Sequence, residues 1–147
     1  MDHKTMMRRI LTSTAYRMRD ILRDMPTGFE DFEPGLDART PLQILMHINV
    51  ILSGVNEVFQ GKPRNEVEDM SWPEALENFH VLSRKLDETI QSKMVCDEKT
   101  TIAMYQGPMC DMLTHVGQLA LLRRLYGSPV QIDTIYYKIE MTDGTDL

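Results

Sequence analysis

Residues 110–130, CDMLTHVGQLALLRRLYGSPV, form an apolar helical run that contains an acidic residue and a histidine four positions apart, Asp111 and His115. The pattern predicts a helix that begins at a Gly-Pro pair, with Pro108 at its first position, and ends at Gly127. The two arginines of LLRRLY complement the negative end of its dipole. An apolar helix of this kind must be buried against others, so the fold depends on what surrounds it.

A first amphipathic helix is predicted over residues 6–25, where apolar side chains recur every three or four positions. Pro26 and Gly28 end it. The following residues, 26–39, are rich in proline, glycine and acidic side chains, and they predict a long irregular connection.

Two capping-box patterns predict the starts of two further helices. In TPLQ, Thr40 is the predicted N-cap and Gln43 closes the box, whereas in SWPE the same roles fall to Ser71 and Glu74. Both starts are followed by long apolar stripes. Four helices with broad apolar faces are buried most economically as an antiparallel four-helix bundle, so we expect an all-α fold.

The chain has 147 residues, a length typical of a single domain. Residues 131–147 change period, with apolar and polar side chains alternating as in an extended segment. Three structures remain open for this tail: a strand paired with a second copy, an extended tail packed on the domain, or a short helix.

Charge and composition exclude several classes of partner. The chain has 22 acidic and 16 basic residues, a net charge of -6, so phosphate backbones and anionic lipid would repel it. We therefore expect neither nucleic acid nor membrane as a partner. Cys96 and Cys110 are far apart, which does not make a disulfide framework, and the N-terminus lacks a signal-peptide pattern, so a cytoplasmic location is expected.

Three polar residues fall on helices that should be buried. Asp111 and His115 project from one face of their helix, and His47 lies within the apolar face of the helix that begins at Pro41. Two imidazoles and a carboxylate suit zinc, nickel, iron or cobalt, and three ligands leave positions open for substrate. An equally simple interpretation is that Asp111 favours the helix N-terminus, or pairs with His115 without any metal.

Two residues that follow His115 in the sequence also bear on the predicted site. Gln118, three residues after His115, is placed to donate or accept a hydrogen bond that orients a ligand. Gly117, in mid-helix, predicts the close approach of another backbone. No side chain is singled out as catalytic, and Cys110 is expected to be a buried, inert thiol.

These residues resemble a known family. The stretch HVGQLALLRRLYGSPV is similar to the end of the last helix in the DinB-like superfamily, and TPLQILMHI resembles the start of that family's second helix, with His47 at the position of a metal-binding histidine. The Gly-Pro pair before the last helix and the spacing from Trp72 to Ile90 resemble one branch of it. The resemblance covers most of residues 40–130.

The resemblance implies an up-down-down-up bundle, commonly a homodimer, with a divalent metal, zinc or nickel, held by three side chains that are usually histidines. His47 and His115 match two of these positions, and Asp111 occupies the third, a departure from the family pattern. Family members include transferases that use the low-molecular-weight thiols glutathione, mycothiol or bacillithiol. The resemblance therefore implies a metal-dependent thiol S-transferase or a hydrolase.

A non-enzymatic alternative also follows from the sequence. Twelve methionines, with their flexible and polarizable side chains, suit either core filling or an adaptable apolar pocket. Such a chain would be a metal-free bundle that binds a small apolar ligand or a peptide, or a dimeric scaffold whose buried histidines and aspartate merely pair.

Overall fold

The computed structural model describes residues 2–63 and 68–130, and every regular element within them is helical. The α-helices are α1 (His3–Leu22), α2 (Pro41–Phe59), α3 (Trp72–Glu88), α4 (Glu98–Met104) and α5 (Cys110–Leu125). A 3-10 turn, η1 (Phe29–Asp31), and two π-helical segments, η2 (Thr89–Lys93) and η3 (Tyr105–Met109), complete the set. The prediction of an all-α fold is confirmed, whereas the predicted extended tail, 131–147, lies outside the described residues.

Helices α2 and α3 begin where their capping boxes predict. The Gln43 backbone N–H donates to Thr40 Oγ1 over 3.3 Å, and the Thr40 N–H donates back to Gln43 Oε1 over 2.9 Å. Ser71 and Glu74 form the same reciprocal pair at the start of α3. Each box satisfies backbone donors that the first helical turn leaves without a partner, which fixes where the helix starts.

The connection between α1 and α2 is anchored by one aromatic residue. Phe29, in η1, is completely buried and packs edge to face against Tyr126, which follows α5. The Tyr126 hydroxyl donates to the Thr27 carbonyl over 2.9 Å. The end of α5 is therefore held against the first part of the connection, while residues 33–39 remain largely exposed.

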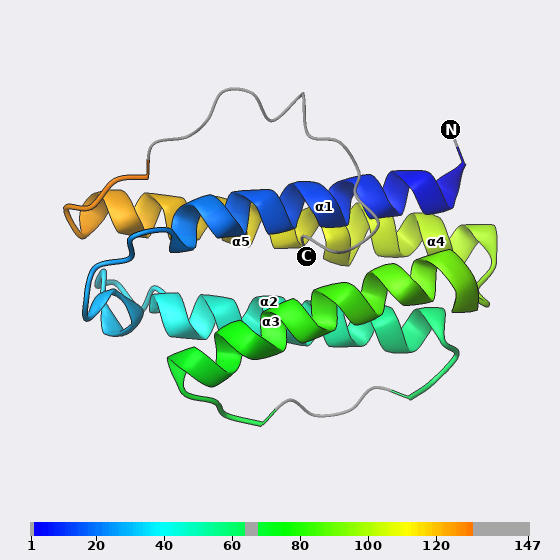
Figure 1. The fold of residues 1–147 in the computed structure, drawn as a ribbon, viewed down its shortest axis with the longest axis horizontal. Helices are drawn as coiled ribbons and strands as arrows, with labels where there is room; N and C mark the ends of the chain where they lie inside the picture. Colours follow the sequence, from blue (N-terminus) through cyan, green and yellow to red (C-terminus); the bar gives the residue numbers. More distant parts are fainter. Residues whose placement is uncertain (1, 64–67, 131–147) are drawn as a thin grey trace.

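The last long helix begins ten residues earlier than the sequence predicts. Segments α4, η3 and α5 follow one another from Glu98 to Leu125, so Pro108 lies inside helical structure and not at its first position (Figure 1). The true N-cap is Asp97, whose carboxylate accepts the Thr100 N–H over 2.7 Å. A proline inside an α-helix removes one hydrogen bond and crowds the preceding turn, and the wider π-helical turn of η3 accommodates it. The predicted start at Pro108 is wrong.

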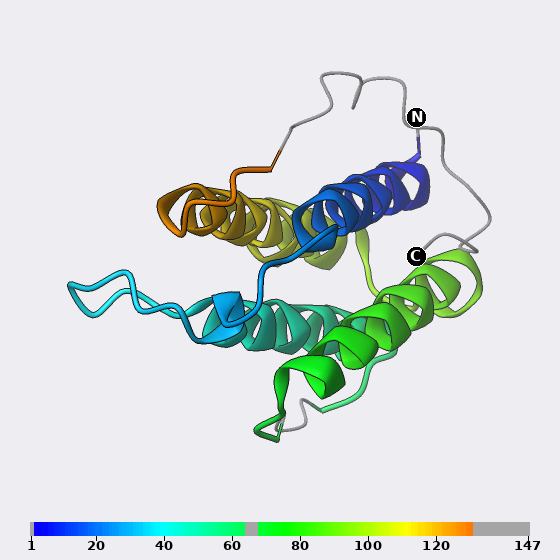
Figure 2. The same ribbon diagram turned by 60° about the vertical axis from the view of Figure 1, so that its left-hand side comes forward.

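The helices lie in two layers. Helix α1 packs beside α5, and α2 packs beside α3, in both views of the ribbon (Figures 1 and 2). Helix α1 and the α4–α5 run point one way along the long axis, while α2 and α3 point the other way (Figure 1). Contacts between α2 and α5 join the layers, and these two helices supply the candidate site.

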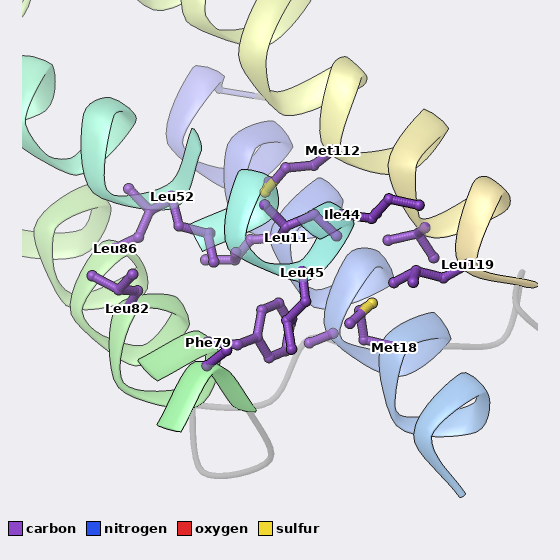
Figure 3. Close-up of a cluster of buried hydrophobic side chains, with 14 of the residues drawn as sticks. Leu11, Met18, Ile44, Leu45, Leu52, Phe79, Leu82, Leu86, Met112 and Leu119 are labelled. Atoms are coloured by element: carbon purple, nitrogen blue, oxygen red, sulfur yellow. The ribbon is translucent and has the colours of Figure 1, made fainter. Parts of the chain in front are cut away.

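The core fills the space between the layers. Leucine, isoleucine, methionine and phenylalanine side chains from α1, α2, α3 and α5 meet there (Figure 3). The cluster contains Leu11, Met18, Ile44, Leu45, Leu52, Phe79, Leu82, Leu86, Met112 and Leu119. Methionine here fills the core, since Met7, Met18, Met109 and Met112 are fully buried.

Two other features bear on sequence predictions. By length and composition, α2 is the one described helix that would suit a bilayer, but 56% of its apolar window is buried inside the protein, as in the core helix of a soluble domain. Gly117 faces outward, and a methyl group added there would meet no atom within 4 Å. The predicted close approach of a backbone at Gly117 is therefore wrong.

A candidate metal centre between α2 and α5

The structure brings His47 of α2 together with Asp111 and His115 of α5. Each of the three offers a ligand atom, and these atoms all lie within 4.8 Å of one another. The two imidazole rings are nearly perpendicular, with centroids 4.6 Å apart. The three residues that the sequence singled out are thus neighbours, although they come from opposite layers of the fold.

The carboxylate of Asp111 lies between the two histidines. Its Oδ2 atom is 3.2 Å from His115 Nε2 and 3.8 Å from His47 Nε2. The side chain of His115 is 8% exposed, that of His47 33% and that of Asp111 49%. The cluster is therefore closed on the His115 side and open to solvent beside His47 and Asp111.

Gln118 forms a hydrogen bond with the Nδ1 nitrogen of His115. The Nδ1 atom of His115 lies 2.9 Å from Gln118 Oε1, and because an amide oxygen only accepts, Nδ1–H must be the donor. In the neutral ring, Nε2 then carries a lone pair. In this neutral tautomer that lone pair faces a carboxylate oxygen at 3.2 Å, and a hydrogen joins the two atoms only when Nε2 is protonated as well.

Asp111 is held by a neighbour one turn along. The Thr114 hydroxyl lies 3.2 Å from Asp111 Oδ1 and donates to the Asp111 carbonyl over 2.8 Å. Since the helix runs unbroken from Glu98, Asp111 is far from a free helix N-terminus, and the macrodipole gives no reason for an acid at this position. Asp111 does lie in the first turn of α5, as predicted, but because α4 and η3 directly precede this turn, it is not at a free helix start.

An open depression of about 600 Å³ adjoins the cluster. Its lining combines His47 and Asp111 with apolar and small residues of α2, η3 and α5. The other lining residues are Val50, Ile51, Gln106, Gly107, Pro108, Cys110 and Thr114. Because His47 and Asp111 form part of its wall, a molecule in this depression would lie directly against their ligand atoms.

His47 is held in its neutral form. Burial is the main cause that lowers its pKa, electrostatic interactions with Arg39 and with the His115 ring lower it further, and Asp111 raises it. A neutral imidazole is the form that ligates metals. The environment thus favours the protonation state that a metal site requires.

Several residues around the site were not singled out from the sequence. The π-helical segment η3 brings Gln106, Gly107 and Pro108 into the depression, and π-helical turns are frequent at functional sites. Thr114 could have been predicted as a neighbour of Asp111, because residues three positions apart on a helix lie on the same face. Cys110, expected to be an inert buried thiol, is half-buried and lines the depression, but it is not one of the three clustered ligands.

The chain was compared with protein-family models, with curated proteins and with solved structures, and none of the three comparisons gives a match.

Proposed function

We propose that this protein binds one divalent metal ion through His47, Asp111 and His115. The observation that carries the proposal is the convergence of one ligand atom from each of these three residues, all within 4.8 Å of one another. Within this cluster His115 Nε2 and Asp111 Oδ2 lie 3.2 Å apart, and when the neutral ring donates its one proton to Gln118 Oε1, both are lone-pair atoms. A cation shared by both atoms would turn the repulsion into two favourable bonds.

The donor set fits such an ion chemically. Two neutral imidazoles and one carboxylate suit zinc, nickel, iron or cobalt, and with a divalent ion they leave a net charge of about +1. We propose zinc or nickel as the physiological metal. Three protein ligands leave coordination positions free, and the exposure of His47 and Asp111 places those positions beside the open depression.

As an activity, we propose a metal-dependent transferase that uses a low-molecular-weight thiol. The bound metal would hold the thiol as thiolate and lower its pKa. The depression supplies apolar surface from Val50, Ile51 and Pro108 for the electrophile, while Thr114 keeps Asp111 oriented. The resemblance to DinB-like thiol transferases supports this choice of chemistry.

The same resemblance supports finer statements about the fold and assembly. We propose that the two helical layers form an up-down-down-up four-helix bundle of the DinB-like type and that the protein is a cytoplasmic homodimer. The chain directions seen in Figure 1 support the topology. Sedimentation equilibrium tests the dimer: a single species of about 17 kDa would exclude it.

Metal analysis tests the central proposal. Protein purified without a histidine tag, then stripped with chelator and reloaded with zinc or nickel, is expected to hold close to one metal ion per chain. His47→Ala is expected to abolish this binding, whereas His80→Ala, a half-buried histidine on α3, serves as the matched control and leaves it intact. Absence of stoichiometric metal from the reloaded protein, or equal binding by His47→Ala, would overturn the proposal.

A further inference from the structure

A second groove, distinct from the depression beside the metal ligands, lies between the connection before α2 and the outer face of α5. Its volume is about 550 Å³, within the range of small-molecule sites. In Figure 2 the connection projects to the left, at the end of the molecule where α5 also ends. The lining is mostly apolar: Pro34, Leu36, Ala38, Ile44, Leu121, Leu122 and Leu125, with Gly35, Asp37, Arg39 and Gln118.

The apolar wall of this groove is exposed. Leu121 and Leu125, one turn apart on α5, are 55% and 59% exposed, and Leu36 opposite them is fully exposed. Leu36 and Asp37 both adopt left-handed backbone angles, with φ of 55° and 56°, a conformation that non-glycine residues rarely adopt. A disfavoured backbone thus presents a leucine to solvent at the rim of an apolar groove, as binding loops often do.

Two residues in the lining of the groove offer hydrogen-bond donors. Arg39 lines the groove and forms no ion pair with any carboxylate in the described ranges, 2–63 and 68–130. Gln118 also lines it, and because its Oε1 accepts from His115, its amide NH₂ group is left without a partner among the residues that the structure describes. A guanidinium and an amide NH₂ in the lining of an apolar groove are suited to a carboxylate.

We propose that this groove binds a small organic acid with an apolar chain. The carboxylate accepts hydrogen bonds from Arg39 and Gln118, and the chain lies along Leu121, Leu122 and Leu125. Charge complementarity to Arg39, the one cation among the described lining residues, favours an acid over an alcohol or an amine. Asp37, the one acid among the described lining residues, opposes this attraction. This site goes beyond the metal centre, and occupancy of the groove requires no metal.

Calorimetric titration of the chelator-treated full chain with octanoate, and separately with 1-octanol, tests the proposal. Octanoate is expected to bind more tightly than octanol. Arg39→Gln is expected to weaken octanoate binding by roughly tenfold, the effect of losing a charge-assisted hydrogen bond, and to leave octanol unchanged. Arg124→Gln, which removes the same charge from an exposed position of α5 outside the groove, is the matched control.

Two further variants test the groove's contacts with the apolar chain of the ligand and with its carboxylate. Leu125→Ser should weaken octanoate and octanol alike, and Asp37→Asn should strengthen octanoate alone. Equal affinity for octanoate and octanol, no difference between Arg39→Gln and Arg124→Gln, or binding only after metal is added would each overturn the proposal. A dimer that Leu125→Ser dissociates and octanoate does not would instead assign this face to a second copy of the chain.

Discussion

Two polar clusters of this molecule differ in how their hydrogen-bonding groups are matched. Between α1 and α3, Arg8 donates through two nitrogens to both oxygens of Asp87, at 2.7 and 3.2 Å, and the Asp87 side chain is only 3% exposed. Between α2 and α5, Asp111 Oδ2 lies 3.2 Å from His115 Nε2, which carries a lone pair when the neutral ring donates its proton to Gln118. In the first cluster each contact joins a donor to an acceptor, whereas the second, with His115 neutral, has more acceptors than donors.

This difference in the matching of donors and acceptors distinguishes a cluster that stabilises the fold from one suited to bind a ligand. A matched pair such as Arg8 and Asp87 needs nothing from outside the protein, because each buried charge is neutralised by the other. A surplus of acceptors, held in place by Gln118 and Thr114, leaves attraction available for a cation. Variants in the two clusters should therefore change different quantities, stability in one case and metal affinity in the other.

The largest effect on folding is expected from Asp87→Ala. The change leaves the Arg8 guanidinium without its carboxylate partner in a largely buried position, so the free energy of unfolding should fall by about 3 kcal/mol or more. Urea denaturation measures this, and the exposed neighbour Glu88→Ala is the control. Metal bound per folded chain should not change. If Asp87→Ala behaved like Glu88→Ala, the matched pair would not stabilise the fold as described.

Gln118→Leu should weaken metal binding while leaving the three ligands in place. Leucine keeps the bulk of the side chain but removes the acceptor that holds the proton on His115 Nδ1, and loss of such an orienting partner lowers metal affinity by roughly 10- to 100-fold. Competition with a chromophoric chelator measures the affinity. Gln106→Leu, at an exposed position in the wall of the depression, is the control. Unchanged affinity in Gln118→Leu would show that the tautomer is fixed by other means.

Asp111→Asn should have opposite effects on the metal-free and metal-loaded protein. The new amide can donate to His115 Nε2, so the acceptor contact becomes a hydrogen bond, and the metal-free protein should gain about 1 kcal/mol of stability. The metal-loaded protein should lose the stabilisation that metal provides. Thermal unfolding in chelator and in excess zinc separates the two. Destabilisation in chelator would mean that His115 carries a second proton and forms an ion pair with Asp111.

The starts of α2 and α3 could be predicted from the sequence because capping side chains determine them, but the start of the last long helix could not. Thr40 and Ser71 were recognised because a capping residue and its partner lie within four positions of each other. Pro108 has the same local pattern as a helix start, yet it lies inside η3. Whether a proline begins a helix or is accommodated within one depends on the preceding turns, here residues 98–107, and on their packing.

Part of the candidate site could likewise be predicted from the sequence, and part of it could not. Asp111, His115 and Gln118 are predictable because helical spacing places them on one face, and His47 followed from an apolar helix face and a family resemblance. The approach of α2 to α5, the depression formed by η3 and the charge of Arg39 near His47 depend on tertiary packing. No local pattern in the sequence contains that information.

The smallest expected effect is a pH dependence that originates at His47. Burial lowers the pKa of His47 in the folded protein, so the unfolded chain, with a pKa near 6.5, binds the proton first as the pH falls. Stability should therefore be complete above about pH 6.5 and decline as the pH falls from there toward the lowered folded value. His47→Gln should flatten part of this decline in urea denaturation between pH 7.5 and 5.5, whereas His80→Gln should not. Because the His47 side chain is one-third exposed, this change in the free energy of unfolding should be smaller than the changes predicted for the other variants. A steeper decline in His47→Gln than in the unmodified protein would show that the folded protein stabilises the charged ring.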